Sequence, residues 1–560
     1  MEISFPTLAL MSILTIAVLR SAWSVLRWVW LKPKELERCL REQGFRGNSY
    51  RIFFGDLKES SRMINEATSK PMSFTNDITP RVSPFPFQTL KNYGKNSFTW
   101  IGPTPRVHVM DTEQLKDIFS KHTTFQKPQG NPLTKLLVTG LASYEAEKWA
   151  KHRKIINPAF HLEKLKSFLP AIHQSCNDMI CKWVSSITKE GSIELDVWPY
   201  LQNLASDVIS RTAFGSSFEE GRLIFELQRE QAELTMKAIQ TVYIPGWRYL
   251  PTKMNRRMKE IHNKIQASLK DLINKREKET KAGEARNDDL LGILIESNIR
   301  EIQEHGNDKN IGMNLKDVIE ECKLFYFAGQ ETTSVLLVWT MVSLSKYPYW
   351  QARAREEVLE VFGKDNKPDF EGLNHLKVVT MILYEVLRLY PPVVVLTRRI
   401  HEVTKLGTLS LPAGVQISLP TILIHHDHEL WGDDADEFKP ERFSDGVLEA
   451  TKGKLSFFPF GWGPRICIGQ NFAMIEAKVA LSMVLQRFSF ELSPSYAHAP
   501  LTVITLQPRS LTLRISLSQS HRLAAHSMSL CPSCSLSLLL NLRCLDFGYY
   551  GLVFRFSMLN

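Results

Sequence analysis

Phe460-Gly461-Trp462-Gly463-Pro464-Arg465-Ile466-Cys467-Ile468-Gly469 is the stretch of this 560-residue sequence that decides the fold. It places one cysteine in a glycine-rich loop just before a predicted helix. Glycine permits positive φ and lets the backbone approach a large planar ligand, while a helix N-terminus and nearby amides stabilise a thiolate. A lone cysteine between glycines is usually an ordinary loop residue. The full pattern F-x-x-G-x-R-x-C-x-G instead indicates a thiolate site at Cys467, with Arg465 able to pair with a negative group on the ligand.

Two further motifs supply charges for a buried cluster. Glu385-Val386-Leu387-Arg388 places its acid and its arginine at i and i+3 on one helix face. Such a pair alone is weak support for a buried cluster, because exposed ion pairs at this spacing are common. Pro440-Glu441-Arg442-Phe443 follows, and buried charges persist only when they are mutually paired. We therefore predict that Arg442 joins Glu385 and Arg388 in a structural cluster.

The longest predicted helix contains Ala328-Gly329-Gln330-Glu331-Thr332-Thr333. Hydroxyls in a helix can simply bond back to a preceding carbonyl. A glycine, an acid and hydroxyls midway along an otherwise apolar helix are costly, however, and favour a functional role. Further upstream, Trp149-Ala150-Lys151-His152-Arg153 places Trp149 and Arg153 at i and i+4, a spacing that alone would indicate a packing pair.

Together, and in this order, these motifs resemble the cytochrome P-450 superfamily, the haem-thiolate monooxygenases, over residues 33–505. The resemblance implies haem b as the cofactor and Cys467 as its axial ligand, whose thiolate favours O–O cleavage. It also implies that Thr332 hydrogen-bonds dioxygen and that Glu331 helps to relay protons. The cofactor-binding residues that it implies are Trp149, Arg153, Arg398, Phe460 near the sulfur, Arg465, Cys467 and Gly469. Counting does not separate Arg398 from its neighbour Arg399.

No G-x-G-x-x-G nucleotide fingerprint is present, because Gly461 and Gly463 are followed by Ile466. Electrons must then come from another protein, and the resemblance implies an NADPH-cytochrome reductase. The favoured reaction is hydroxylation of a hydrophobic small molecule with O2. A haem-thiolate isomerase or dehydratase working without a reductase is one alternative, against which the intact Glu331-Thr332 pair argues. An inactive haem-binding protein is another, suggested by the unusual C-terminus.

The predicted fold class is mainly α with a minor β portion, with the haem between the long central helix and the cysteine loop. Apolar periodicity predicts helices at 314–346, with Asn314 as N-cap, at 374–390 and at 470–487. Short alternating runs predict strands at 98–101, 107–110, 393–398 and 415–419. We divide the chain into a membrane anchor (1–31), the haem-thiolate monooxygenase domain (32–515) and a Ser/Leu-rich tail (516–560) that we expect to be disordered.

The N-terminus reads as a single membrane span. The apolar stretch 5–19 is interrupted by Arg20 and resumes at 21–31 with three tryptophans, which suit a membrane interface. Basic residues follow at 27–41, so the positive-inside rule places the catalytic domain in the cytosol, and the microsomal resemblance implies the endoplasmic reticulum membrane. A cleaved signal peptide is the rival, weakened by the missing basic n-region. Pro33 is expected to end the helix.

Composition excludes several other classes. The net charge of +10 is scattered, and no basic stretch is interleaved with aromatics, so no nucleic-acid partner is predicted. Eight cysteines are too few for a disulfide scaffold, and the Cys531/Cys534 pair lacks a second ligand pair. The run 425–428 (His-His-Asp-His) contains side chains that can bind a metal ion. The resemblance implies that this segment is a surface turn, however, so we assign no metal to it.

The resemblance narrows to the plant microsomal branch that contains secologanin synthase and terpenoid and gibberellin oxidases. The segments that narrow it are Leu31-Lys32-Pro33-Lys34 and Gly47-Asn48-Ser49-Tyr50-Arg51. Members of this branch oxidise bulky, mostly apolar terpenoids, so a terpenoid substrate is expected. After Gln507-Pro508 the chain departs from the family pattern, which suggests a loosened final hairpin.

Overall fold

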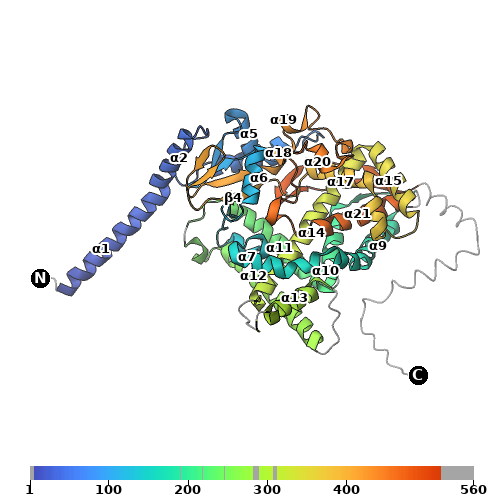
Figure 1. The fold of residues 1–560 in the computed structure, drawn as a ribbon, viewed down its shortest axis with the longest axis horizontal. Coiled ribbons are helices and arrows are strands. Elements are labelled where there is room, and N and C mark those ends of the chain that lie inside the picture. The colour runs from blue at the N-terminus through green and yellow to red at the C-terminus, as the bar shows by residue number, and fades with distance from the viewer. Residues whose placement is uncertain are drawn as a thin grey trace, which may run out of the picture.

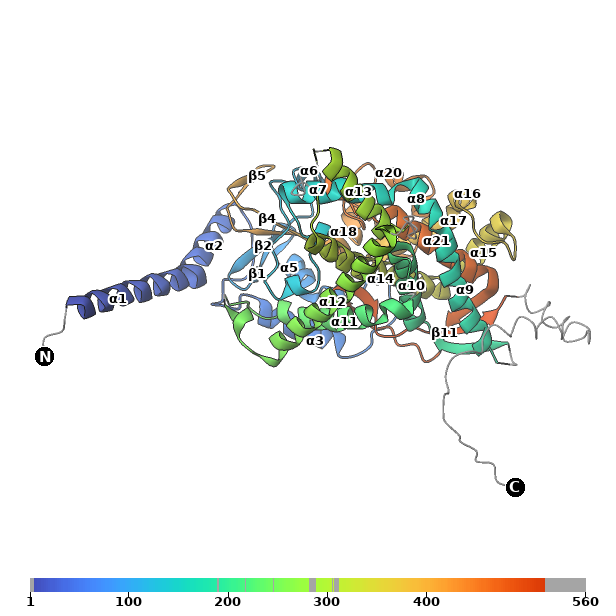
Figure 2. The same ribbon diagram turned by 90° about the horizontal axis from the view of Figure 1, so that it is seen from below.

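The helix α14 (Leu315–Lys346) runs through the middle of the body, and most other helices pack around it (Figures 1 and 2). The Asn314 side chain accepts a hydrogen bond from the Asp317 amide at 2.9 Å and so caps its N-terminus. From Val335 to Leu344 every residue is buried, as expected of a helix that is apolar on all faces. The prediction of a long central helix over 314–346 is confirmed.

This computed structural model describes residues 5–188, 191–216, 218–244, 246–281, 289–304, 306 and 312–518. The fold is mainly helical with a minor strand portion, as predicted. The α-helices are α1 (Phe5–Leu26), α2 (Lys32–Glu42), α3 (Leu57–Thr68), α4 (Thr79–Val82), α5 (Pro84–Tyr93), α6 (Thr112–Ser120), α7 (Ala146–Ile156), α8 (Leu162–Ser167), α9 (Leu169–Ser186), α10 (Trp198–Phe214), α11 (Phe218–Ile239), α12 (Lys253–Lys281), α13 (Leu290–Glu304), α14, α15 (Pro348–Phe362), α16 (Phe370–His375), α17 (Lys377–Leu389), α18 (Thr421–His425), α19 (His428–Trp431), α20 (Gly446–Ala450) and α21 (Gln470–Arg487).

Single-turn helices of other types join these elements: η1 (Arg27–Leu31), η2 (Thr134–Leu136), η3 (Gly140–Ala142), η4 (Asn157–Phe160), η5 (Trp247–Tyr249), η6 (Pro440–Phe443) and η7 (Gly463–Arg465). The helix α14 packs against α10, α12, α17 and α21. Because α21 starts three residues after Cys467, this packing fixes the cysteine loop relative to the central helix.

Within the described residues, four small sheets flank the helices. The largest has the strand order β1-β2-β7-β4, with β2 and β7 parallel and the other pairs antiparallel. The others are β3-β11-β8, the hairpin β9-β10 and the hairpin β5-β6. The strands are β1 (Phe98–Ile101), β2 (Thr104–His108), β3 (Ser192–Asp196), β4 (Leu396–Arg399), β5 (Thr404–Leu406), β6 (Leu409–Leu411), β7 (Gln416–Leu419), β8 (Phe488–Leu492), β9 (Pro500–Val503), β10 (Thr505–Pro508) and β11 (Thr512–Leu517).

Several predicted boundaries are confirmed and others shift. The helix at 470–487 and the strand at 98–101 have the predicted bounds. The predicted strand at 107–110 begins earlier, at Thr104, and the one at 393–398 begins later, at Leu396. The predicted helix at 374–390 is two elements, because Leu376 leaves the helical conformation between α16 and α17. Such end effects depend on capping and on packing partners rather than on local propensity.

The N-terminal helix projects away from the body (Figure 1). The prediction that Pro33 ends this helix is wrong: a π-helical turn, η1, follows α1, and α2 continues from Lys32 with the proline in its first turn. Proline is tolerated there because its missing N–H is not needed at a first-turn position. One helical stretch, Ala9–Glu42, is long and apolar enough to cross a membrane, and none of its most apolar window is buried against the protein.

At the other end, β11 lies between β3 and β8. It runs to Leu517, so the ordered sheet extends past the expected domain boundary at 515. The remainder of the tail, including Cys531 and Cys534, lies outside the described residues.

Candidate active site

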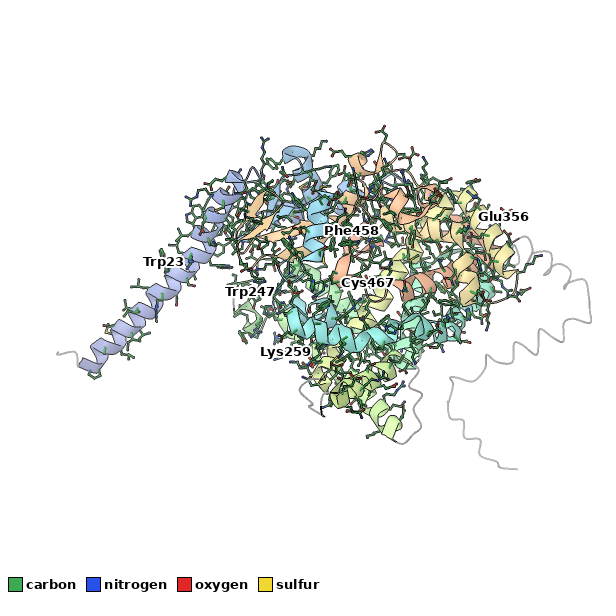
Figure 3. All side chains as sticks on the ribbon, in the orientation of Figure 1. Trp23, Trp247, Lys259, Glu356, Phe458 and Cys467 are labelled. Atoms are coloured by element: carbon green, nitrogen blue, oxygen red, sulfur yellow. The ribbon has the colours of Figure 1, made fainter. Side chains whose placement is uncertain are left out.

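The cysteine loop is held by its own backbone. The Cys467 amide donates to the Phe460 carbonyl at 2.9 Å, and the Ile466 amide donates to Gly463 at 3.0 Å. Gly463 has a φ of 71°, and a Cβ there would lie 3.1 Å from the Phe119 carbonyl oxygen, so a side chain would be both strained and crowded. Figure 3 shows Cys467 in the central part of the body, near Phe458.

The sulfur of Cys467 lies where polar groups converge. Burial raises the pKa of its thiol above the ordinary value, and a hydrogen bond from the Gly469 amide and the positive charges of Arg153 and Lys127 offset only part of that rise. Burial also raises the pKa values of Cys176 and Cys322, and acidic neighbours raise them further. Of Cys176, Cys322 and Cys467, only Cys467 has cations and the amide of another residue beside its sulfur, and both lower the cost of forming a thiolate.

Predicted cofactor-binding residues of α7 contact this loop directly. Arg153 donates from Nη1 to the carbonyl of Ile466 at 2.9 Å. Arg465 lies over the Trp149 ring, 4.4 Å from its centroid, and forms an ion pair with Glu145 at 3.1 Å. The i, i+4 spacing therefore does place Trp149 and Arg153 together at the cysteine loop. Glu145, which orients Arg465, was not predicted.

The geometry separates Arg398 from Arg399. Successive side chains of a strand point to opposite faces, and Arg398 is the buried one, with its guanidinium 5.4 Å from the Phe119 ring centroid. Burial and the charge of Arg465 lower the pKa of Arg398 to about 10. Arg398 is therefore on the side of the cysteine loop.

A fourth cation, Lys127, was not predicted because no motif surrounds it. Burial and the charges of Arg465 and Arg398 lower the pKa of Lys127 to about 7. Its Nζ donates to the Ala142 carbonyl at 2.7 Å. Lys127, Arg153, Arg398 and Arg465 gather near Cys467, and within the described part of the chain the carboxylate that acts on Lys127, Arg398 and Arg465 is Glu145. The cluster has the charge needed to bind an anionic ligand.

The predicted structural cluster forms, with one addition. Arg388 and Glu385 are fully buried and share two hydrogen bonds, of 2.8 and 2.7 Å. Arg442 lies 3.5 Å from Glu385 but only 2.7 Å from Asp434, so its nearer partner is an acid that was not predicted. Arg388 also donates to the carbonyls of His425 and Ala435. These bonds satisfy the buried charges, consistent with a structural cluster.

The histidines at 425–428 lie beside this cluster and have partners within the protein. The His425 Nε2 accepts from the Phe458 amide at 3.2 Å. His426 contacts Asp436 through Nδ1 at 2.9 Å and the Leu389 carbonyl through Nε2 at 3.0 Å. Through these contacts of His425 with Phe458 and of His426 with Leu389, the run 425–428 links the end of α17 to the segment that leads into the cysteine loop.

The contacts of Gly329 and Thr332 on α14 give each residue a local structural explanation. A Cβ at Gly329 would lie 2.7 Å from Ile209 Cγ1, so glycine permits the close approach of α10. The Thr332 hydroxyl donates to the Ala328 carbonyl at 2.8 Å, which is the back-bonding that helices commonly show. The Thr332 side chain is half-buried, and its oxygen can still accept a hydrogen bond.

Glu331 has partners that the sequence did not reveal. Its Oε1 accepts from the Thr505 hydroxyl at 2.6 Å and also from the Gln507 amide nitrogen. Burial raises the pKa of Glu331, outweighing these bonds and the charge of Arg229, which lower it. A buried carboxyl of this kind favours its protonated form, as a proton donor requires.

Comparison with known proteins identifies the family of this chain. Residues 81–512 match the family profile described as Cytochrome P450. The chain belongs to the cytochrome P450 family. Cytochrome P450 72A397 of Kalopanax septemlobus is 64% identical over 488 residues, covering 87% of this P450 and 94% of the relative. Secologanin synthase 2 of Catharanthus roseus is 58% identical, covering 88% and 94%. The 7-deoxyloganic acid hydroxylase of the same plant is 55% identical, covering 91% and 98%.

A solved structure shares the fold of this P450. Retinoic acid-bound cyanobacterial CYP120A1 superposes with a TM-score of 0.67 at 22% identity, covering 79% of this chain and 96% of that one. Membership of the family makes this P450 a monooxygenase with a haem-iron cofactor. The residues present fit such a group, because a sulfur with backbone support lies beside four cations that could pair with the haem carboxylates.

Proposed function

We propose that this P450 oxidises a bulky terpenoid with O2, using haem b bound through Cys467 and electrons from an NADPH-cytochrome reductase. The observation that carries the proposal is that Arg153 donates to the loop carbonyl beside Cys467, while the Gly469 amide and the charges of Arg153 and Lys127 act on its sulfur. The relatives named for secologanin and 7-deoxyloganic acid support a terpenoid substrate. When bound, haem supplies reductive activation of O2.

Each residue of the site would then have a distinct task. Arg398, Arg465 and Lys127 would bind the haem carboxylates, together with Trp149 and Arg153 of α7. Glu331 would hold a proton at its buried carboxyl and help to relay it, and the half-buried Thr332 hydroxyl would hydrogen-bond O2. Phe460 would pack near the sulfur and exclude water from it.

The anchor supports a membrane location. Tyr50 donates from its hydroxyl to the Val29 carbonyl at 2.7 Å, and the Trp28 and Phe53 rings are 6.4 Å apart, so the end of the anchor is docked on the body. Exposed apolar side chains lie nearby, at Ile52, Phe53 and Phe54, and others at Tyr249 and at Trp247, which Figure 3 labels. We infer that this face lies against the cytosolic side of the endoplasmic reticulum membrane, and that the chain crosses the membrane once.

The first test is the carbon-monoxide difference spectrum of the full chain in microsomal membranes. We expect a thiolate-type Soret band that is lost in Cys467→Ser and retained in Cys181→Ser, a matched control at an exposed cysteine. A thiolate-type band that persists in Cys467→Ser would contradict the ligand assignment.

The second test is turnover with reductase and NADPH, using 7-deoxyloganic acid and a panel of terpenoids. We expect oxygenated product only when both NADPH and reductase are present. Product formed from a peroxide without NADPH would instead support an isomerase or dehydratase. A thiolate spectrum without turnover of the panel or NADPH oxidation would support an inactive haem-binding protein.

A further inference from the structure

The carboxyl of Glu331 is tied to a strand far from it in sequence. Both donors on β10, the Thr505 hydroxyl at 2.6 Å and the Gln507 amide nitrogen, bond to the same atom, Oε1. Gln507 also donates to the Thr505 oxygen at 3.2 Å, which links the two donors. No hydrogen bond between the side chains of Glu331 and Thr332 is recorded in the described structure, where Thr332 bonds to Ala328.

This arrangement has a consequence for the position of the proton. An oxygen that accepts two hydrogen bonds is occupied as an acceptor and is a poor place for the acidic hydrogen. When Glu331 is protonated, its hydrogen must therefore reside on Oε2. Two donors on one oxygen also prevent the carboxyl from rotating, so the direction in which Oε2 presents the proton is defined.

The strand that supplies these donors is itself rigidly placed. Ile504, the turn residue between β9 and β10, has a φ of 63°, a strained value for a β-branched residue. The residues on either side of it, Val503 and Thr505, are directly paired. Leu506 is bonded twice: its amide donates to the Pro392 carbonyl at 3.0 Å, and its carbonyl accepts from Trp339 Nε1 at 2.9 Å. The hairpin is thus fixed to α14 through both Trp339 and Glu331.

We propose that Thr505 and Gln507 are positioning residues that orient the Glu331 carboxyl so that Oε2 carries the proton delivered during O2 reduction. The proposal rests on the proposed function, in which Glu331 is the proton donor. It assigns the β9-β10 hairpin a role in proton delivery in addition to its place in the fold. The burial of Glu331 (9% exposed) and of Thr505 (2% exposed) supports it, because water cannot easily replace the lost donors.

The test uses the full chain in membranes with reductase and NADPH, without added substrate. Under these conditions O2 takes up two electrons and two protons and leaves as hydrogen peroxide (NADPH + H⁺ + O2 → NADP⁺ + H2O2). We expect Thr505→Val and Gln507→Leu each to slow NADPH oxidation about tenfold, since one hydrogen bond to a buried neutral carboxyl contributes up to this order. We also expect the ratio of rates in H2O and D2O to increase, because proton transfer limits the reaction more strongly.

Two controls separate positioning from loss of structure. Thr505→Ser keeps the hydroxyl and should retain the wild-type rate and isotope ratio. Trp339→Phe removes the other hydrogen bond between the hairpin and α14 without touching Glu331, and should leave the isotope ratio unchanged. All variants should retain the thiolate-type carbon-monoxide spectrum.

The outcomes distinguish this proposal from the proposed function. It is overturned if Thr505→Val and Gln507→Leu keep the wild-type isotope ratio, or if Trp339→Phe raises the ratio equally. A loss of the carbon-monoxide spectrum in both variants would also overturn it, since the hairpin would then act on the fold. Absence of the thiolate spectrum or of NADPH oxidation in the wild type would instead reject the proposed function.

Discussion

Arg153 of α7 donates a hydrogen bond to the carbonyl of Ile466, the residue that precedes Cys467, at 2.9 Å. The bond fixes the cysteine loop against a helix that lies more than 300 residues away in sequence. It also places a positive charge near the sulfur, where it lowers the pKa of the thiol.

Replacing Arg153 with leucine should weaken haem retention. A charge-assisted hydrogen bond contributes about 1.5–3 kcal/mol, so we expect haem loss to excess apomyoglobin to accelerate roughly tenfold or more. Lys154→Met, at an exposed neighbour that pairs with Glu301, is the matched control and should behave as the wild type. Equal loss rates for the wild type and Arg153→Leu would show that this bond has no such role.

Arg398 and Arg399 should differ although they are adjacent. Arg398→Leu removes a buried cation on the side of the cysteine loop, whereas Arg399 points to the opposite face of β4. We expect Arg398→Leu to lower haem content severalfold and Arg399→Leu to leave it nearly unchanged, as measured by the ratio of haem to protein. The reverse order would assign the haem carboxylate to Arg399.

Gly329→Ala should destabilise the protein by overpacking. The added Cβ would lie 2.7 Å from Ile209 Cγ1, and an extra methyl group in a packed core costs about 1–3 kcal/mol. Ile209→Ala removes the obstructing atoms, so Gly329→Ala should cost much less in that background. A double-mutant cycle of urea unfolding tests this, and additive effects would exclude a direct clash.

We expect the free energy of unfolding to differ between the wild type and Asp434→Asn by an amount that depends on pH. Although burial raises the pKa of Asp434, the bonds from Lys439 and Arg442 outweigh it and bring the pKa to about 2, below the value of about 3.9 in unfolded chains. A depressed carboxyl pKa stabilises the folded state above the unfolded pKa, and the contribution is lost as pH falls through the folded pKa.

We therefore expect Asp434→Asn to lower the free energy of unfolding at pH 7 by about 1 kcal/mol, a figure reduced for solvent screening of a partly exposed side chain. The two proteins should converge as the pH falls from about 4 to about 2. Asp433→Asn, at an exposed neighbour, should show no such dependence. A difference between the wild type and Asp434→Asn that is constant over this range would indicate lost packing rather than lost charge.

The sequence alone determined those features in which the interacting residues are close along the chain. The span of α14 follows from its apolar run and from Asn314, and the bounds of α21 follow from its periodicity and Gly469. The Glu385/Arg388 pair lies on a single helical turn, and the mainly α fold class follows from the apolar periodicity. Local spacing is sufficient in these cases because helix geometry itself brings the residues together.

Only the tertiary structure decided which distant residues meet. Glu145 as the partner of Arg465 and Lys127 beside Cys467 depend on how separate elements pack, and the local loop conformation decided that Asp434, eight residues before Arg442, is its nearer partner. The same is true of Thr505 and Gln507 on Glu331, and of Ile209 opposite Gly329. No periodicity encodes these contacts, because they arise when elements separated by up to about three hundred residues bury their faces against each other.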